Sequence, residues 1–215
     1  MIKFSQKLCI IVSVLALASC STAYYSAMEK VGIHKRDIMV DRVGEAKESQ
    51  QEAQEQFKSA LAEMTALINF DGGDLEEQYN EIQEQYEDSK EAADLVSLRI
   101  AKIEDVSEAL FEEWQDEIEE ISSANLKRQS ASKLKDTQRR YKTLIKSMHK
   151  AESKMAPVLS ALKDNSLFLK HNLNAKAVGA LQGEIVSIQK DVAVLIKDMN
   201  AAIEQSQKFI DMLEE

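Results

Sequence analysis

The chain has 215 residues, of which 30% are charged and only 6% aromatic, with six glycines and one proline. So few glycines and prolines, together with abundant Ala, Glu, Lys, Gln and Leu, argue against a β-rich or linker-rich protein and favour long helices. The formal net charge of −10 argues against general nucleic-acid binding, which needs a net basic surface.

The first 19 residues differ from everything after them. Two lysines form a short basic start, residues 8–18 are an apolar run, and small residues precede Cys20. This is the three-part layout of an export signal, and the run is too short to span a bilayer, which takes about 20 apolar residues. We therefore expect residues 1–19 to be a signal peptide, and the rest of the chain offers no other candidate span.

The stretch Leu17-Ala18-Ser19-Cys20 resembles the lipobox of bacterial lipoproteins, in which a cysteine is acylated and becomes the first mature residue. The alternative is an ordinary secreted protein whose cleavage site lies near a cysteine by chance. The resemblance implies several acyl chains on Cys20, which anchor stably where one chain anchors weakly. Ser21 follows, whereas in that class an aspartate usually signals retention at the inner membrane. The resemblance therefore implies a lipid-anchored protein on the periplasmic side of the bacterial outer membrane.

Cysteine usage agrees with export. Cys9 lies inside the expected signal peptide and Cys20 would carry lipid, so the mature chain would keep no free thiol. Thiol catalysis and cysteine-based metal sites are therefore not expected.

From residue 24 onward, apolar residues recur in alternating steps of four and three, with Gln50 filling one polar slot of the first segment. A sustained step of 3.5 is typical of a coiled-coil seam. The pattern forms four such seams, which run from Met39 to Leu67, from Leu75 to Ile121, from Leu134 to Leu169 and from Leu181 to Leu213.

Two of the breaks between the seams contain residues that end or start helices. Residues 69–74 supply two glycines, and Asp74 with Glu77 resembles a capping box that starts the next helix. Residues 172–174 form another break.

The remaining break lies at residues 122–125, where the heptad phase slips by one residue. The slip suits a tight turn capped by Ser123 or Asn125. The alternative is that the second and third segments continue as one very long helix. Pro157 is expected to kink the third helix, because it removes one backbone hydrogen bond.

Short connections between helices of similar length favour antiparallel neighbours. The expected fold is therefore all-α. It is an elongated antiparallel helical bundle or coiled coil of about four long helices, with residues 20–215 forming a single domain after the signal segment.

Charge is distributed unevenly along the expected bundle. Residues 45–121 hold 24 acidic and 5 basic residues, whereas residues 122–176 hold 13 basic and 3 acidic residues. Packing the basic third helix beside the acidic helices would offset their repulsion, which is the favoured interpretation. The alternative is a site for an anionic partner, formed by Lys127, Arg128, Lys133, Lys135, Arg139, Arg140 and Lys142.

Motifs that carry chemistry are not found. No glycine-rich phosphate loop is present, and His34, His149 and His171 stand apart without the spacing of a zinc pair. Residues 71–74 have a calcium-like composition but lack the further oxygen ligands and the final Glu of a calcium loop. We therefore expect no cofactor, no metal site, no small-molecule substrate and no enzymatic activity.

The stretch KVGIHKRDIMVDRV, residues 30–43, mixes both charges densely and carries Gly32 within an otherwise helical pattern. It is either a helix with internal ion pairs or a docking face near the membrane. Its candidate docking residues are Lys30, His34, Lys35, Arg36, Asp37, Asp41 and Arg42.

Together with the export signal and the following AKESQQEAQEQFKSAL, this stretch resembles an uncharacterised family of bacterial coiled-coil lipoproteins, mostly gammaproteobacterial, catalogued as domain of unknown function 2959. The resemblance covers essentially the whole mature chain. It implies no activity, substrate or catalytic residue.

Two functions of different classes remain. The first is a non-enzymatic structural or adaptor protein of the envelope that binds another envelope protein or itself. The second is a binding module for an anionic envelope ligand, which would use the basic third helix. Export would keep nucleic acid out of reach of both.

Overall fold

The computed structural model describes residues 23–68, 75–172 and 175–214. Within these ranges the chain is all-α, as the sequence predicts. A short helical segment at residues 23–30 precedes four long helices: α2 (Lys35–Ile68), α3 (Leu75–Glu120), α4 (Ala124–His171) and α5 (Ala175–Glu214). None of the helices described is both long enough and apolar enough to cross a membrane. The expected signal peptide, Cys20 and the break at residues 69–74, with its capping residue Asp74, lie outside the described residues.

The helices pack as two compact units. Unit 1 comprises Met1–Arg42 and Lys102–Gln138, and unit 2 comprises Val43–Ala101 and Arg139–Glu215. Each of α2, α3 and α4 therefore contributes one part to unit 1 and the other part to unit 2, whereas α5 belongs to unit 2 alone.

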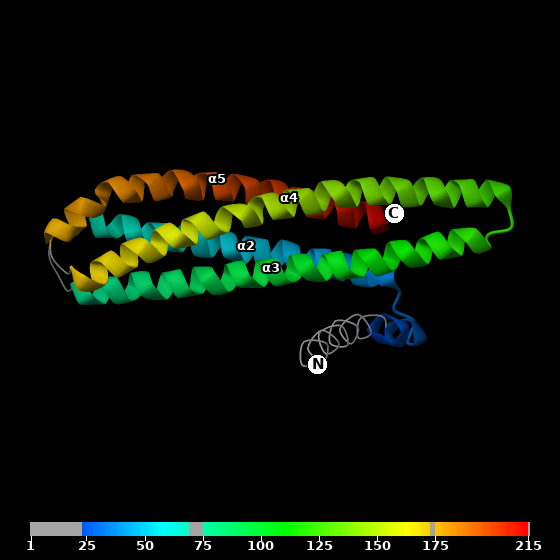
Figure 1. The fold of residues 1–215 in the computed structure, drawn as a ribbon, viewed down its shortest axis with the longest axis horizontal. Helices are drawn as coiled ribbons and strands as arrows, with labels where there is room; N and C mark the ends of the chain where they lie inside the picture. Colours follow the sequence, from blue (N-terminus) through cyan, green and yellow to red (C-terminus); the bar gives the residue numbers. More distant parts are fainter. Residues whose placement is uncertain (1–22, 69–74, 173–174, 215) are drawn as a thin grey trace, which may run out of the picture. The chain divides into compact units, whose positions relative to one another are not determined.

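In unit 2, α2 lies antiparallel to α5 (Figure 1). The Gln54 side chain donates to Asn200 Oδ1 at 3.0 Å, and Gln189 donates to Thr65 Oγ1 at 3.4 Å. The position contacted on α5 falls as the position on α2 rises, so the two helices run in opposite directions.

The other neighbouring helices of unit 2 also run in opposite directions. Glu45 of α2 pairs with Arg99 of α3 at 2.6 Å, and farther along α2 the carbonyl oxygen of residue 56 accepts a hydrogen bond from Ser89. Lys150 of α4 pairs with Asp198 of α5 at 2.6 Å, and the two helices run in opposite directions in unit 2 (Figure 1). Unit 2 is thus an antiparallel four-helix bundle, the packing that short connections predict.

The predicted seams form the core of unit 2. Phe57 and Met64 of α2 are fully buried, as are Ile185 and Leu195 of α5. Burying one such side chain stabilises the fold by about 1.5–3 kcal/mol relative to leaving it exposed. Because the seams meet one another inside the unit, the heptad pattern is satisfied within one chain.

The second half of α3 departs from the predicted seam. Val106 and Ile118 are buried, while Glu117, which the heptad count places on the seam, is exposed. From Leu110 the buried stripe continues in a step of eight residues to Ile118. A continuous α-helix has 3.6 residues per turn, so its buried face drifts away from a strict 3.5 repeat.

The break between the second and third segments is confirmed, and the single long helix is wrong. α3 ends at Glu120 and α4 begins at Ala124. Ser123 is the N-cap, since its carbonyl oxygen accepts the Lys127 amide at 2.8 Å and its hydroxyl lies 3.5 Å from the Leu126 amide. The alternative cap, Asn125, is wrong because it lies inside the helix.

The third helix and its end follow the predicted outline. α4 contains Pro157 and runs on to His171, so the proline does not end it, and the kink stays a prediction. Asn172 then leaves the helix, which agrees with the expected break at residues 172–174, although the last two of those residues lie outside the described ranges.

Candidate functional site

The charge pattern of residues 30–43 indicated one helix. The structure shows a turn around Gly32 that divides the segment. Gly32 donates its amide hydrogen to the Glu29 carbonyl at 3.0 Å, and Ile33 donates to the Met28 carbonyl at 3.0 Å. These two bonds form a Schellman motif, which needs a left-handed residue at the position of Gly32. Gly32 has a φ of +86°, a conformation that glycine adopts without strain.

α2 starts directly after this turn. The His34 carbonyl oxygen accepts the amides of Asp37 at 2.9 Å and Ile38 at 3.1 Å, which makes His34 the N-cap. In return the Asp37 carboxylate accepts the His34 amide at 3.3 Å. This is one half of a capping box. The sequence signal for the turn was Gly32, followed two residues later by the N-cap His34 and three residues after that by the carboxylate of Asp37.

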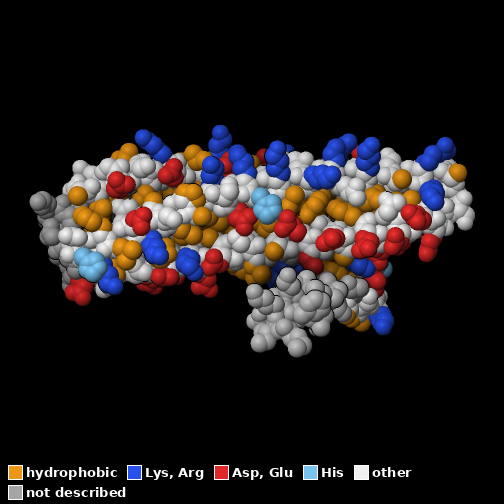
Figure 2. Space-filling model, viewed as in Figure 1, with side chains coloured by type: hydrophobic (Ala, Val, Ile, Leu, Met, Phe, Trp, Pro, Cys, Tyr) orange, Lys and Arg blue, Asp and Glu red, His pale blue; other side chains and the backbone are white. Residues whose placement is uncertain are grey.

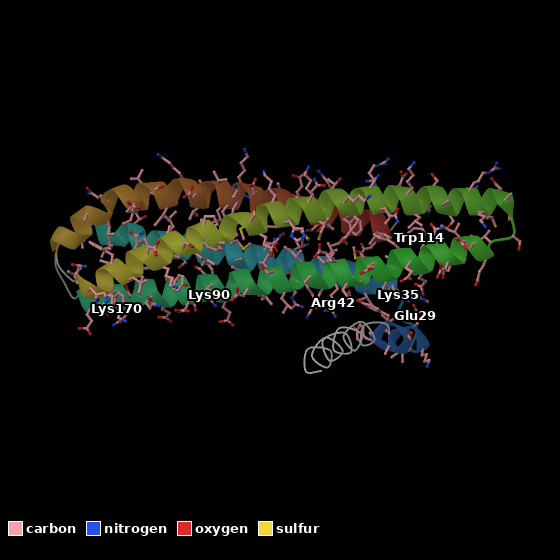
Figure 3. The ribbon with its side chains drawn as sticks, viewed as in Figure 1. Glu29, Lys35, Arg42, Lys90, Trp114 and Lys170 are labelled. Carbon is pink, nitrogen blue, oxygen red and sulfur yellow. The ribbon has the colours of Figure 1, made fainter. Side chains whose placement is uncertain are left out.

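Lys35, the first residue of α2, bridges two carboxylates of unit 1. Its ammonium group lies 2.8 Å from a Glu113 oxygen on α3 and also pairs with Glu29 of the short helical segment (Figure 3). Burial disfavours the ammonium, but the hydrogen bonds to Glu113 and Glu29 outweigh burial and raise the pKa of Lys35. The bond from Lys35 lowers the pKa of Glu29, whereas burial and the charge of Glu29 raise the pKa of Glu113.

Tyr25 fastens the short helical segment to α3 at a second point. Its hydroxyl donates to Asp105 Oδ2 at 2.5 Å, and its side chain is almost fully buried. Burial raises the pKa of Tyr25 well above its usual value, and the hydrogen bond and charge of Asp105 raise it further.

A groove of about 430 Å³ opens in unit 1 beside the start of α2. Its apolar lining comes from Leu110 and Trp114 of α3, and charged side chains of both signs surround them. The indole N–H of Trp114 donates to Ser130 Oγ of α4 at 2.9 Å, which holds the ring in place. The full lining is His34, Lys35, Arg36, Asp37, Leu110, Glu113, Trp114, Glu117 and Lys133.

The groove gathers four of the seven predicted docking residues. Lys30 ends the short helical segment and is exposed, Asp41 is exposed on α2, and Arg42 is half-buried; none of the three lines the groove. The α3 residues of the lining were not predicted as site residues. The only tryptophan of the chain, Trp114, three residues before the seam interruption at Glu117, was the one available signal.

The predicted anion-binding residues lie along α4 and mostly face solvent. In unit 1, Arg128, Lys133 and Lys135 are exposed, while Lys127 is half-buried and donates to the Glu119 carbonyl at 3.1 Å. In the part of α4 that belongs to unit 2, Arg139, Arg140 and Lys142 are exposed. Figure 2 shows basic side chains along the edge where α4 of unit 1 runs and acidic ones where α3 runs. Only Lys133 of this set lines the groove. Neutralisation of the acidic helices by α4 stays a prediction.

Metal-ligating side chains do not gather in the described ranges, where no three His, Cys, Asp or Glu residues are placed to hold an ion. What the site offers instead is a cleft with an apolar lining and charges of both signs. Such a cleft can hold an apolar side chain of a ligand and pair the charges on either side of it.

Comparison with known proteins places the chain in a family. The sequence profile of the family described as "Protein of unknown function (DUF2959)" matches residues 24–213. No curated protein and no solved structure matches the chain significantly. Because the profile covers the short helical segment, all four long helices and the groove, the chain belongs to the DUF2959 family of proteins of unknown function.

Proposed function

We propose that the chain is a non-enzymatic lipoprotein of the bacterial envelope that acts as an adaptor. Cys20 would hold it by acyl chains on the periplasmic side of the outer membrane. The groove of unit 1 would bind a segment of another envelope protein. The observation that carries the proposal is this groove, because it combines Trp114 with charges of both signs next to a rigid turn.

The lining favours a protein segment over a small anion. Arg36 and Lys133 would attract an anion, but Glu113 and Glu117 lie in the same groove and would oppose it. A peptide can satisfy both signs and place an apolar side chain against Trp114. Tryptophan and arginine are also the residues that most often dominate binding energy at protein interfaces.

The packing of unit 2 favours a surface contact over an exchange of helices. Its seam residues already face one another, with Phe57, Met64, Ile185 and Leu195 buried. Pairing through the seams with a second chain would require opening that core, at a cost of about 1.5–3 kcal/mol for each large side chain exposed. A partner is therefore expected at exposed sites such as the groove.

In-cell photo-crosslinking tests the adaptor role. A photoreactive amino acid replaces Arg36 at the groove, and the matched control replaces Lys190, an exposed basic residue of α5 in unit 2. We expect one defined adduct with another envelope protein at position 36 and none at position 190. An adduct with a second copy of the chain would mean that the groove binds the chain itself and not another envelope protein. Recovery of uncrosslinked protein alone, or of the same adducts at both positions, would contradict the proposal.

The exposed basic residues of α4 support a second candidate function, the binding of an anionic envelope ligand. Arg128 and Lys135 are seven residues apart and both exposed, so they lie on one face of the helix. Reversing both charges (Arg128→Glu, Lys135→Glu) should abolish salt-sensitive binding to lipopolysaccharide. The control Lys190→Glu, Lys197→Glu changes two exposed charges of α5 at the same spacing. Equal binding by both variants, or no binding at low salt, would rule this function out.

A further inference from the structure

The turn between the short helical segment and α2 exposes apolar side chains to an unusual degree. Val31 is 71% exposed, more than any other large apolar side chain in the described ranges, and Ile33 is 36% exposed. Tyr24, seven residues before Val31, is 42% exposed. Three of the nine exposed large apolar side chains described thus fall within ten residues.

This exposure belongs to an ordered turn and not to a frayed end. The Schellman motif around Gly32 fixes the backbone that carries Val31 and Ile33. Tyr25 before the turn and Lys35 after it are both fastened to α3 of unit 1. The two apolar side chains are therefore presented in a fixed orientation, and binding would not have to order them first.

The charges next to the turn complement an anionic surface. Lys30 and Arg36 flank it, and both are exposed. The acidic residues between positions 23 and 37 are Glu29, which is paired with Lys35, and Asp37, whose carboxylate accepts the His34 amide. In a chain with a net charge of −10, this is a basic and apolar patch close to the expected lipid anchor. Basic residues near a membrane are attracted to acidic headgroups by about 1 kcal/mol each.

The turn is also within reach of the bilayer to which Cys20 would be fixed. Ten residues lie between Cys20 and Val31, and the eight at positions 23–30 are helical, which shortens their span to about 12 Å. Even with the residues before them fully extended, the turn stays within about 25 Å of the acylated residue.

We propose that this turn is a second membrane contact. Val31 and Ile33 lie in the headgroup layer of an anionic bilayer, and Lys30 pairs with the lipid phosphates. The inference rests on the lipid anchor of the proposed function. One acyl-anchored residue leaves a protein free to swivel, whereas a second contact fixes the orientation of unit 1 and of its groove toward the periplasm.

Depth-dependent quenching tests the contact. The acylated protein with Val31→Cys carries an environment-sensitive fluorophore on its one free thiol and is reconstituted into vesicles of phosphatidylethanolamine and phosphatidylglycerol. Val194→Cys is the matched control, because Val194 of α5 is an apolar residue that is 46% exposed. Nitroxide lipids labelled near the headgroup should quench position 31 several-fold more strongly than position 194. Replacing phosphatidylglycerol with phosphatidylcholine should reduce that difference.

The outcomes separate this inference from the anchor. Mass spectrometry of the purified protein first shows whether Cys20 is acylated. Acylated protein with water-like emission and equal quenching at both positions would overturn the membrane contact and leave the anchor standing. If Cys20 carries no lipid, the anchor fails, and the same vesicles are added to the unanchored protein with Cys9 and Cys20 replaced by alanine, so that position 31 or 194 again holds the one free thiol. A response of the label at position 31 alone would then still support the contact, and the absence of a response would overturn it.

Discussion

At the scale of single residues, Gln50 is a polar side chain inside the apolar core of unit 2. It occupies a seam position of α2 between Ala46 and Ala53 and is fully buried. Neither its amide nitrogen nor its amide oxygen has a hydrogen-bond partner in the described part of the chain. A polar residue at one seam position can specify helix register, and it lowers stability in return.

Replacing this amide should therefore stabilise unit 2. We expect Gln50→Leu, which keeps the side-chain size, to raise the free energy of unfolding by about 1–3 kcal/mol, because it removes an unsatisfied buried group. The measurement is urea unfolding followed by circular dichroism. The control is Gln51→Leu at the adjacent exposed position, which should change stability by less than about 0.5 kcal/mol. A lower stability of Gln50→Leu would show that the amide is satisfied in solution.

Tyr25 should make the stability of unit 1 sensitive to alkaline pH. Its pKa in the folded chain is raised, so above about pH 10 the unfolded chain loses the phenol proton while the folded chain keeps it. The free energy of unfolding should therefore fall as pH rises above that value. Tyr25→Phe should flatten this decline. Urea unfolding followed by Trp114 fluorescence, below and above pH 10, measures it.

Asp105→Asn separates the two causes of that shift. It removes the charge that raises the pKa of Tyr25 but leaves the burial, so its alkaline decline should lie between those of the parent and Tyr25→Phe. Identical declines in the parent and Tyr25→Phe would refute the linkage.

How far single residues could be predicted depends on the distance of their partners along the sequence. The periodic pattern identified Phe57 and Ile185 as core because each seam is recognised from neighbouring residues. The partner of Lys35 was not predicted, since Glu113 lies 78 residues away. Which of many acidic residues meets a given lysine depends on how α2 and α3 pack.

At the scale of elements, residues 30–43 show where a local pattern misleads. Their charges at steps of three and four indicate a helix, and α2 does contain most of them. Gly32 ends one helix and His34 caps the next. The break near Ser123 was predicted because the apolar phase changes there, and the break near Asn172 was predicted from residues that end helices. At Gly32 the heptad seam had not yet begun, so no change of phase marked the turn.

Two glycines should respond in opposite directions to the same substitution. Gly32→Ala should lower stability by about 1–2 kcal/mol, because its φ of +86° is strained for alanine. Gly44→Ala, inside α2, should raise stability by roughly 0.5–1 kcal/mol, since an added Cβ there meets no atom within 4 Å. Thermal unfolding by circular dichroism compares the two. Changes of the same sign would contradict the assigned turn.

At the scale of the whole molecule, the order of the four long helices in the described ranges followed from the sequence, as did the antiparallel packing within unit 2. The seams encode which face of each helix is buried, and short connections leave few ways to pair them. The groove could not be predicted from the sequence, because it depends on how the turn at Gly32 packs against the second half of α3. The buried stripe of α3 drifts because a continuous helix has 3.6 residues per turn, and Trp114, which the 3.5 repeat places on the seam, is half-buried.

The most direct test of an acylated envelope adaptor is metabolic labelling with an acyl-chain analogue. Cells that express the parent chain or Cys20→Ala are labelled, and the protein is recovered from separated inner and outer membranes. We expect label on the parent protein in the outer-membrane fraction and none on Cys20→Ala. An unlabelled parent protein, or equal label on both, would contradict the anchor on which the proposed function depends.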